Sequence, residues 1–364
     1  MGKHSKGGGT KVLVIILIIL IIAAGGVLGY KIMKDRQNTD DTVAEETPVA
    51  EKEEVKEEKK VQIYSGTDRP IAVMIDNHSD AWPQVGLQKA YMIYEIIVEG
   101  GETRLMALFK GADVEKIGPV RSARHYFLDY AMENDAIYAH FGESPQAKSD
   151  IKKFSIAEIN GIAEDGTTFW RVKEKAAPHN ALTSTAKLIE SAKNKKYRMT
   201  SDKKSVLNYV TDEVNLEEGQ GAVSVTIPHS DKQIVKYTYN EEKKVYERTA
   251  RNRKQTDWTT GETLTTKNII VTFCDNYTLS DTENKGRQGL KNIGTFDGYY
   301  ITNGKAIKIK CIKNNRDEQT TYQDLAGNAI NVNDGNTFVN ICPTSSKVVI
   351  EEGTTNTTGT TVAQ

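Results

Sequence analysis

Hydrophobic and polar positions separate the chain into segments of very different character, and the first is an unbroken apolar run at residues 12–28, VLVIILIILIIAAGGVL. It is about as long as a helix must be to cross a hydrocarbon core at ~1.5 Å per residue. Lysines precede this run and no acidic residue does. We therefore expect a cytoplasmic tail at 1–11, a single transmembrane anchor at 12–30 and an extracytoplasmic remainder. A cleavable signal peptide is the alternative, although its apolar region is usually only about 7–15 residues long.

The segment after the apolar run is polar. Residues 35–60, DRQNTDDTVAEETPVAEKEEVKEEKK, contain no aromatic side chain. Such a stretch buries too little apolar surface to offset the entropy lost on ordering. We predict a disordered linker at 31–64 and a second disordered segment at the C-terminal end, 351–364.

Between residues 65 and 215, strand-like and helix-like patterns alternate. RPIAVMID (69–76) is a short apolar run typical of a buried strand, and two further runs at 94–109 flank Gly100-Gly101. Ala123, Phe127 and Tyr130 have helical spacing, DAIYAHFG (135–142) reads as a strand, and Ser144-Pro145 is an N-cap followed by a first helical residue. This alternation predicts an α/β-type domain at 65–215.

From residue 216 to 350 the pattern is strand after strand. Alternating runs such as QIVKYTYN and KAIKIKCIK are separated by turn residues, among them Asn303-Gly304, a strong hairpin signal. We predict a mostly antiparallel β domain at 216–350. The chain as a whole is then of the α+β class, with two domains after the membrane helix.

The runs at 94–109, YEIIVEGGETRLMALF, carry charges on an otherwise apolar element. If Gly100-Gly101 is a two-residue turn, Glu99 faces Glu102 and Ile97 faces Arg104. Glu95 and Glu99 then share one face of the hairpin, with Arg104 diagonal to both. The pattern therefore predicts a patch of carboxylates and a guanidinium. An exposed sheet face with a salt bridge worth about 0–1 kcal/mol is the structural alternative.

Further polar residues of the first domain could join this patch. Asp76, Asn77 and His78 lie at the C-terminal end of the predicted strand at 69–76, where α/β domains often place their sites. Arg121 and Arg124 lie near the start of a predicted helix, where the helix dipole is unfavourable for cations and a partner anion or carboxylate is expected. Together with the histidines of the first domain, the predicted substrate-binding residues are Asp76, Asn77, His78, Glu102, Arg104, Arg121, Arg124, His140, Ser144, His179 and Asn180. Ser144 is also explained as an N-cap, and its surroundings lack the second glycine of a nucleophile elbow.

Composition narrows the choice of partners. With 48 Lys and Arg against 49 Asp and Glu, the net charge is −1, so the chain has no overall attraction to nucleic acid. The three cysteines, Cys274, Cys311 and Cys342, are widely spaced and show no metal-binding or redox motif. We expect them to be small buried core residues, and a single disulfide between two of them is the alternative. We expect no cofactor and no metal ion.

Five segments in order resemble the YerB-like family of bacterial envelope proteins: RPIAVMIDNH, YEIIVEGGETRLMALF, KIGPVRSARHYFLDYA, AHFGESPQA and TTFWR…APHNALTS. GYYITNGKAIKIKCIKNN and the following TYQDLAGNAINVNDGNTFVNICP resemble the C-terminal domain of the same family. The resemblance covers about residues 65–345. It implies an N-terminal domain of unknown function, a separate C-terminal domain and a location outside the cytoplasmic membrane. Family members are typically lipoproteins, whereas this chain has no cysteine near its apolar run.

These residues support three functional hypotheses. The first is cleavage of peptidoglycan glycan strands, as by a lytic transglycosylase, with Glu99 as general acid and base and Glu95 tuning its pKa. The second is a non-catalytic module that binds cell wall or an envelope protein, with Arg104, Arg121 and Arg124 holding carboxylates or an anionic polymer. The third is a metal-dependent hydrolase that uses Asp76, His78, His140 and His179.

Overall fold

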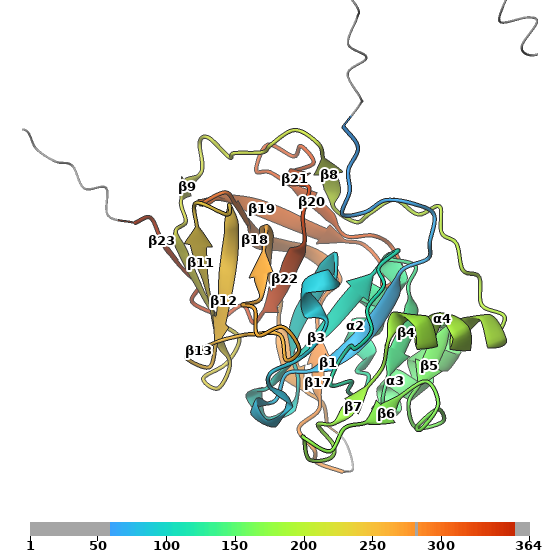
Figure 1. Ribbon diagram of the computed structural model, residues 1–364. Coiled ribbons are helices and arrows are strands. Elements are labelled where there is room, and N and C mark those ends of the chain that lie inside the picture. Colours follow the sequence, from blue (N-terminus) through green and yellow to red (C-terminus); the bar gives the residue numbers. More distant parts are fainter. Residues whose placement is uncertain (1–58, 281–282, 354–364) are drawn as a thin grey trace, which may run out of the picture. The chain divides into compact units, whose positions relative to one another are not determined.

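A sheet of eleven strands runs through both predicted domains (Figure 1). The structure is a computed structural model and describes residues 59–280 and 283–353. The strand order is β20-β19-β18-β15-β22-β2-β3-β1-β4-β5, with β9 paired to β19. The N-terminal half contributes β1 (Ile71–Asp76), β2 (Met92–Ile97), β3 (Thr103–Phe109), β4 (Ile137–His140) and β5 (Glu158–Asn160). The C-terminal half contributes β9 (Gln220–Gly221), β15 (Asn268–Phe273), β18 (Gly294–Thr302), β19 (Lys305–Lys313), β20 (Thr321–Gln323) and β22 (Thr337–Cys342).

The two halves join through backbone hydrogen bonds. Strand β2 pairs in parallel with β22, with Met92 opposite Thr337 and Ile96 opposite Ile341. The described residues accordingly fall within one compact unit that begins at Glu58. Because this unit contains its own buried cores, we expect the fragment 58–364 to fold by itself.

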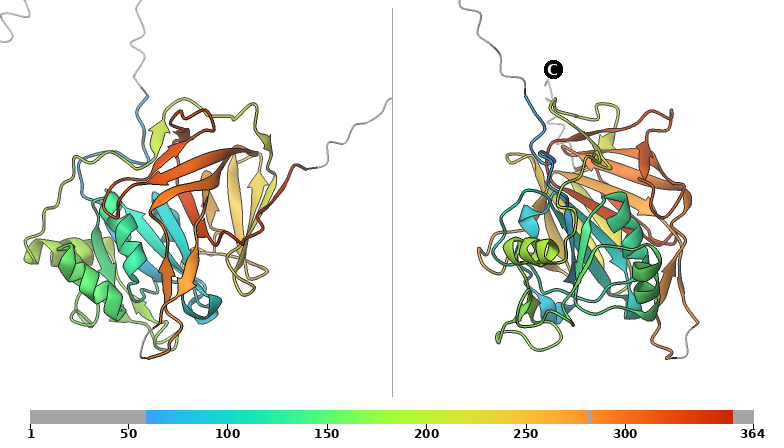
Figure 2. Two further views of the ribbon diagram at one scale, coloured as in Figure 1. Left: turned by 180° about the vertical axis from the view of Figure 1, so that it is seen from behind. Right: turned by 90° about the vertical axis from the view of Figure 1, so that its right-hand side faces the viewer.

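Smaller elements cover the large sheet. A six-stranded sheet consists of β10 (Ser224–Pro228), β11 (Ile234–Asn240), β12 (Val245–Ala250), β13 (Arg253–Lys254), β14 (Thr265–Thr266) and β23 (Val349–Glu351). The two-stranded pairs are β6 (Trp170–Arg171) with β7 (Ala181–Leu182), β8 (Asn208–Val210) with β21 (Asn331–Asn333), and β16 (Asn276–Thr278) with β17 (Gln288–Leu290). The described α-helices are α2 (His125–Glu133), α3 (Pro145–Lys153) and α4 (Thr185–Asn194), and short 3-10 helices are η1 (Ser79–Ala81), η2 (Leu87–Lys89) and η3 (Glu99–Gly101). Figure 2 shows the six-stranded sheet and the helices at opposite ends of this arrangement.

The core lies on both faces of the large sheet. Side chains alternate along β1, so Val73 and Ile75 enter one apolar cluster while Ala72 and Met74 enter the other. The first cluster includes residues of β10, β11, β12 and α4, and the second includes residues of α2 and α3. Burial on both faces explains why this strand is a continuous apolar run rather than an alternating one.

Local signals in the sequence predicted many elements correctly. Ser144 caps α3 by accepting a hydrogen bond from the Ala147 backbone, and Pro145 is the first helical residue. Asn303 and Gly304 form the two-residue turn between β18 and β19, both with positive φ. The described residues are mostly β with few helices. The expected α/β pattern of the first half is limited to the parallel strands β1, β4 and β5, whereas β2 and β3 are antiparallel.

The predicted anchor at 12–30 and most of the predicted linker and tail lie outside the described residues. No helix within residues 59–280 and 283–353 has the length and apolar character needed to cross a membrane. At the end of the predicted linker, the backbone N–H groups of Gln62 and Ile63 donate to the carboxylate of Asp334 at 2.8 and 2.9 Å. This part of the linker is therefore bound to the folded unit.

Candidate functional site

The hairpin of β2 and β3 has a different register from the predicted one. Ile97 lies opposite Thr103 and Ile96 opposite Arg104, and the Val98 N–H donates to the Glu102 carbonyl at 2.7 Å. The loop therefore contains three residues, 99–101, rather than two. Its glycines supply positive φ values of 69° and 76°. Because side chains alternate along a strand, this shift of one residue places Glu95 and Arg104 on opposite faces.

Glu95 consequently lies in the core and not in a site. Its side chain has no exposed surface, and it forms an ion pair with the fully buried Arg248 of β12. Thr103 Oγ1 donates to Glu95 Oε1 at 2.7 Å, and Gln233 Nε2 donates to the same oxygen at 3.1 Å. Burial raises the pKa of Glu95, but the charges of Arg248 and His229 outweigh it and lower the pKa below its usual value. The prediction of a catalytic role for Glu95 is wrong, because neither water nor substrate reaches its carboxylate.

A solvent-open hollow of about 530 Å³ does form on the other side of the hairpin. We call it the arginine pocket. Among the predicted residues, its lining includes Asp76, His78, Glu99, Glu102, Arg104, Arg121, Arg124, Ser144 and His179. These residues come from the end of β1 and the loop after it, the hairpin loop and the start of β3, the segment before α2, the N-cap of α3 and the loop before β7. A smaller hollow of about 140 Å³ between residues 84–89 and 255–264 contains none of them.

Asp76 organises one wall of the arginine pocket. It ends β1 opposite Arg104, and its side chain is almost entirely buried. Asp76 Oδ1 accepts from the His78 backbone at 3.0 Å, while Oδ2 lies 2.7 Å from His179 Nδ1 and 3.1 Å from Arg121 Nε. One carboxylate thus orients an imidazole and a guanidinium that are distant in the sequence.

Arg104 is the unusual group of the arginine pocket. It is only 7% exposed, yet within the described ranges its guanidinium has no carboxylate partner and donates one hydrogen bond, to the Ser122 carbonyl. Burial, together with the nearby charge of Arg124, lowers the pKa of Arg104 to about 9. The charges of Glu99 and Asp76 act on Arg104 in the opposite direction, but neither carboxylate forms an ion pair with it. A buried guanidinium that faces a hollow without a direct carboxylate contact is suited to binding an anion.

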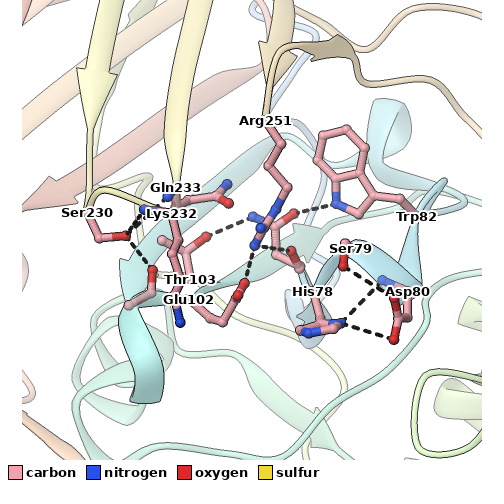
Figure 3. A network of polar contacts seen from close by, with 12 residues as sticks. His78, Ser79, Asp80, Trp82, Glu102, Thr103, Ser230, Lys232, Gln233 and Arg251 are labelled. Atoms are coloured by element: carbon pink, nitrogen blue, oxygen red, sulfur yellow. Dashed lines mark hydrogen bonds and ion pairs between the residues drawn. The ribbon is translucent and has the colours of Figure 1, made fainter.

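The other charges of the hairpin loop are paired. Arg124 donates from Nε to Glu99 Oε1 at 2.6 Å and from Nη2 to Oε2 at 2.9 Å, a bidentate pair. Burial raises the pKa of Glu99, but these hydrogen bonds and the charge of Arg124 lower it overall. Glu102 forms an ion pair with Arg251, drawn in Figure 3.

Three predicted substrate-binding residues lie outside this pocket. Asn77 is fully buried, accepts from Trp82 Nε1 at 3.1 Å and holds the loop after β1 in place. His140 is fully buried between the Gly142 carbonyl at 2.8 Å and Glu158 at 2.7 Å. Asn180 accepts from Arg171 at 2.9 Å. These side chains make structural hydrogen bonds, so a direct role in binding is not supported for them.

Sequence reasoning missed the charged pocket residues Glu143, Lys285 and Arg287. Glu143 directly precedes the predicted N-cap, which was a usable signal. Lys285 and Arg287 follow a turn-rich segment of the second domain, and Arg287 pairs with Glu283 at 2.5 Å. Nothing in their local sequence indicates that this loop reaches a pocket of the first domain.

The fold and the pocket agree with the family that the sequence comparisons identify. Residues 56–198 match the N-terminal domain and residues 223–339 the C-terminal domain of a protein family of unknown function, DUF3048, and the chain belongs to this family. It is similar to "Putative lipoprotein YerB" of Bacillus subtilis (strain 168), with 29% identity over 299 residues that cover 78% of this chain and 84% of the relative. The crystal structure of YerB protein from Bacillus subtilis superposes with a TM-score of 0.69 at 28% identity, covering 78% of this chain and 94% of that one. The YerB-like resemblance is therefore confirmed.

Proposed function

We propose that this protein binds an anionic group of a cell-envelope polymer, a carboxylate or a phosphate, in the arginine pocket. The observation that carries the proposal is Arg104, a buried guanidinium with no carboxylate partner among the described residues. Arg121 and Arg124 line the same hollow and add positive charge beside it. Burial is the main cause of the lowered pKa of Arg104, and the charge of Arg124 adds to it. A bound anion would offset both the cost of the buried charge and this repulsion.

The proposed place of action is the outer side of the cytoplasmic membrane. The relative from Bacillus subtilis carries the name "Putative lipoprotein YerB", and the apolar run at 12–28 in this chain has the length of a membrane anchor. Peptidoglycan stem peptides carry carboxylates and other wall polymers carry phosphates, so both are ligands of suitable chemistry. An envelope protein with an acidic segment is a further partner of the same kind.

Cleavage of glycan strands by Glu99 is the second candidate, because its carboxylate lines an open hollow. A lytic transglycosylase needs this group protonated at the start of the reaction. The bidentate pair with Arg124 lowers the pKa of Glu99 and so favours the ionised form. Glu95, the carboxylate expected to raise the pKa of Glu99, is sealed in the core and does not line this hollow. Binding is therefore the better-supported function.

One experiment tests both candidates. The fragment 58–364 is incubated with purified sacculi that either retain or lack their phosphate-containing polymers, and the bound protein is measured by co-sedimentation at increasing salt. We expect binding that weakens as salt rises, and at least a ten-fold loss of affinity in Arg104→Met, since a charge-assisted contact contributes about 1.5–3 kcal/mol. Arg198→Met is the matched control, because Arg198 is exposed, pairs with Asp135 and does not line the pocket.

Whether binding requires the phosphate-containing polymers distinguishes a phosphate ligand from a carboxylate ligand. Binding that disappears with the phosphate-containing polymers identifies phosphate, whereas binding that persists and is lost after amidation of the stem peptides identifies carboxylate. Equal binding by wild type and Arg104→Met would contradict the proposal. Release of anhydro-muropeptides that stops in Glu99→Gln would instead establish glycan cleavage.

A further inference from the structure

His78, Asp80 and His179 form a cluster of metal-ligand side chains at the edge of the arginine pocket. One ligand atom from each residue lies within 4.8 Å of the others. The rings of His78 and His179 are stacked, with centroids 4.7 Å apart and an angle of 18° between their planes, and both histidines line the pocket. They are brought together from the loop after β1 and the loop before β7, far apart in the sequence.

His179 is held in the orientation that a metal ligand needs. Its Nδ1 lies 2.7 Å from the buried Oδ2 of Asp76, which leaves Nε2 as the nitrogen available to an ion. A carboxylate that accepts the second N–H of a histidine is the usual support of a metal-bound imidazole, because it sets the tautomer and raises the basicity of the other nitrogen. Asp76 would therefore act as a positioning residue rather than as a ligand.

His78 and Asp80 are spaced to complete such a site. His78 Nδ1 lies 3.6 Å from Asp80 Oδ2, close to the separation of about 3.3 Å between two ligand atoms of a tetrahedral zinc ion with bonds of about 2.0–2.1 Å. Both side chains are exposed enough to rotate into place. In Figure 3, His78 Nδ1 also accepts from the Asp80 backbone, at 3.2 Å, and ion binding would replace this hydrogen bond.

We propose that His78, Asp80 and His179 bind one divalent transition-metal ion, for which zinc is the best match. Two imidazoles and one carboxylate suit zinc and similar ions, whereas calcium and magnesium prefer sites built from oxygen alone. Three protein ligands leave one tetrahedral position for water or for a ligand in the arginine pocket. The inference is independent of the anion-binding function, since none of its ligands is an arginine.

The test is a metal titration of the fragment 58–364 without a polyhistidine tag. This fragment excludes His4, which would otherwise offer a competing imidazole. After removal of metal with a chelator, Co²⁺ is added and its visible absorption is followed, and Zn²⁺ affinity is then measured by calorimetry. We expect one equivalent of Co²⁺ per chain with the intense absorption of a tetrahedral or five-coordinate ion, displaced by Zn²⁺.

Variants locate the ion. His78→Ala, His179→Ala and Asp80→Asn should each weaken Zn²⁺ binding by at least about ten-fold, and Asp76→Asn should weaken it while leaving one equivalent bound. His125→Ala is the control, because this half-buried histidine lies outside the cluster, and it should bind as wild type does. Circular dichroism checks that each variant is folded. Absence of stoichiometric binding in wild type, or unchanged binding in folded His78→Ala and His179→Ala, would overturn the proposal.

Discussion

Glu95 and Arg248 form an ion pair in which neither side chain has any exposed surface. Glu95 belongs to β2 of the N-terminal domain and Arg248 to β12 of the C-terminal domain. The pair therefore connects the two halves of the family's architecture within one core. Arg248 also donates to Gln255, so both charges have several hydrogen-bond partners.

We expect either Glu95→Gln or Arg248→Met alone to lower the free energy of unfolding by about 3–5 kcal/mol, because each leaves a buried charge without its partner. The double variant Glu95→Met/Arg248→Met should cost clearly less than the sum of its single changes. Urea unfolding of the fragment 58–364 measures these values. The ion pair between the exposed Arg198 and the partly buried Asp135 is the reference, with an expected cost of about 0–1 kcal/mol for Arg198→Met. Single changes in the core pair that cost no more than this would refute the assignment.

Arg104→Met should make the protein more stable while it weakens anion binding. Burial lowers the pKa of Arg104 to about 9, so the group stays charged at neutral pH, but its charged form is less stable in the folded state than in the unfolded state. Replacing it with an uncharged side chain removes that cost. If the change stabilises the fold by about 1 kcal/mol, Tm should rise by about 1.5 °C in a folded unit of roughly 300 residues, because unfolding entropy is about 2.1 cal/mol/K per residue; scanning calorimetry measures this rise. A fall in Tm would mean that Arg104 has a structural role.

Glu99→Gln should make the free energy of unfolding depend less on pH in the acidic range. Because the pKa of Glu99 is lowered from its usual 4.5, the unfolded state binds its proton more readily than the folded state does. The resulting stabilisation is present above about pH 4.5 and is lost as the pH falls through the folded-state pKa. Comparing urea unfolding at pH 7 and pH 3 in wild type and Glu99→Gln measures this difference. Glu190→Gln, at an exposed position of α4, should leave the wild-type dependence unchanged.

The three cysteines should react with thiol reagents only after unfolding. Cys274, Cys311 and Cys342 are free and buried. Burial raises the pKa of Cys274 and of Cys311 to about 12, so their reactive thiolate forms are scarce at neutral pH. Alkylation followed by intact mass measurement should show no modification of the native fragment and three modifications in denaturant. Fewer than three under non-reducing denaturation would reveal a disulfide.

Short-range signals explain where sequence reasoning succeeded. The N-cap at Ser144 and the turn at Asn303-Gly304 depend on residues that are neighbours in the chain, so their structures follow from local backbone chemistry. The hairpin of β2 and β3 shows the limit of such signals. Its two glycines are compatible with a two-residue or a three-residue loop. The loop in the structure has three residues, and the resulting register places Glu95 in the core rather than in the expected patch.

The sequence by itself determined most of the strands and helices, the membership of the YerB-like family and the charged residues of the arginine pocket other than Glu143, Lys285 and Arg287. Only the tertiary structure decided that Glu95 pairs with Arg248, that Arg104 has no carboxylate partner among the described residues, and that His78 meets His179. The physical reason is that these relationships join residues tens to more than a hundred positions apart. Their distances depend on strand register and on the packing of separate elements, which no local pattern of side chains encodes.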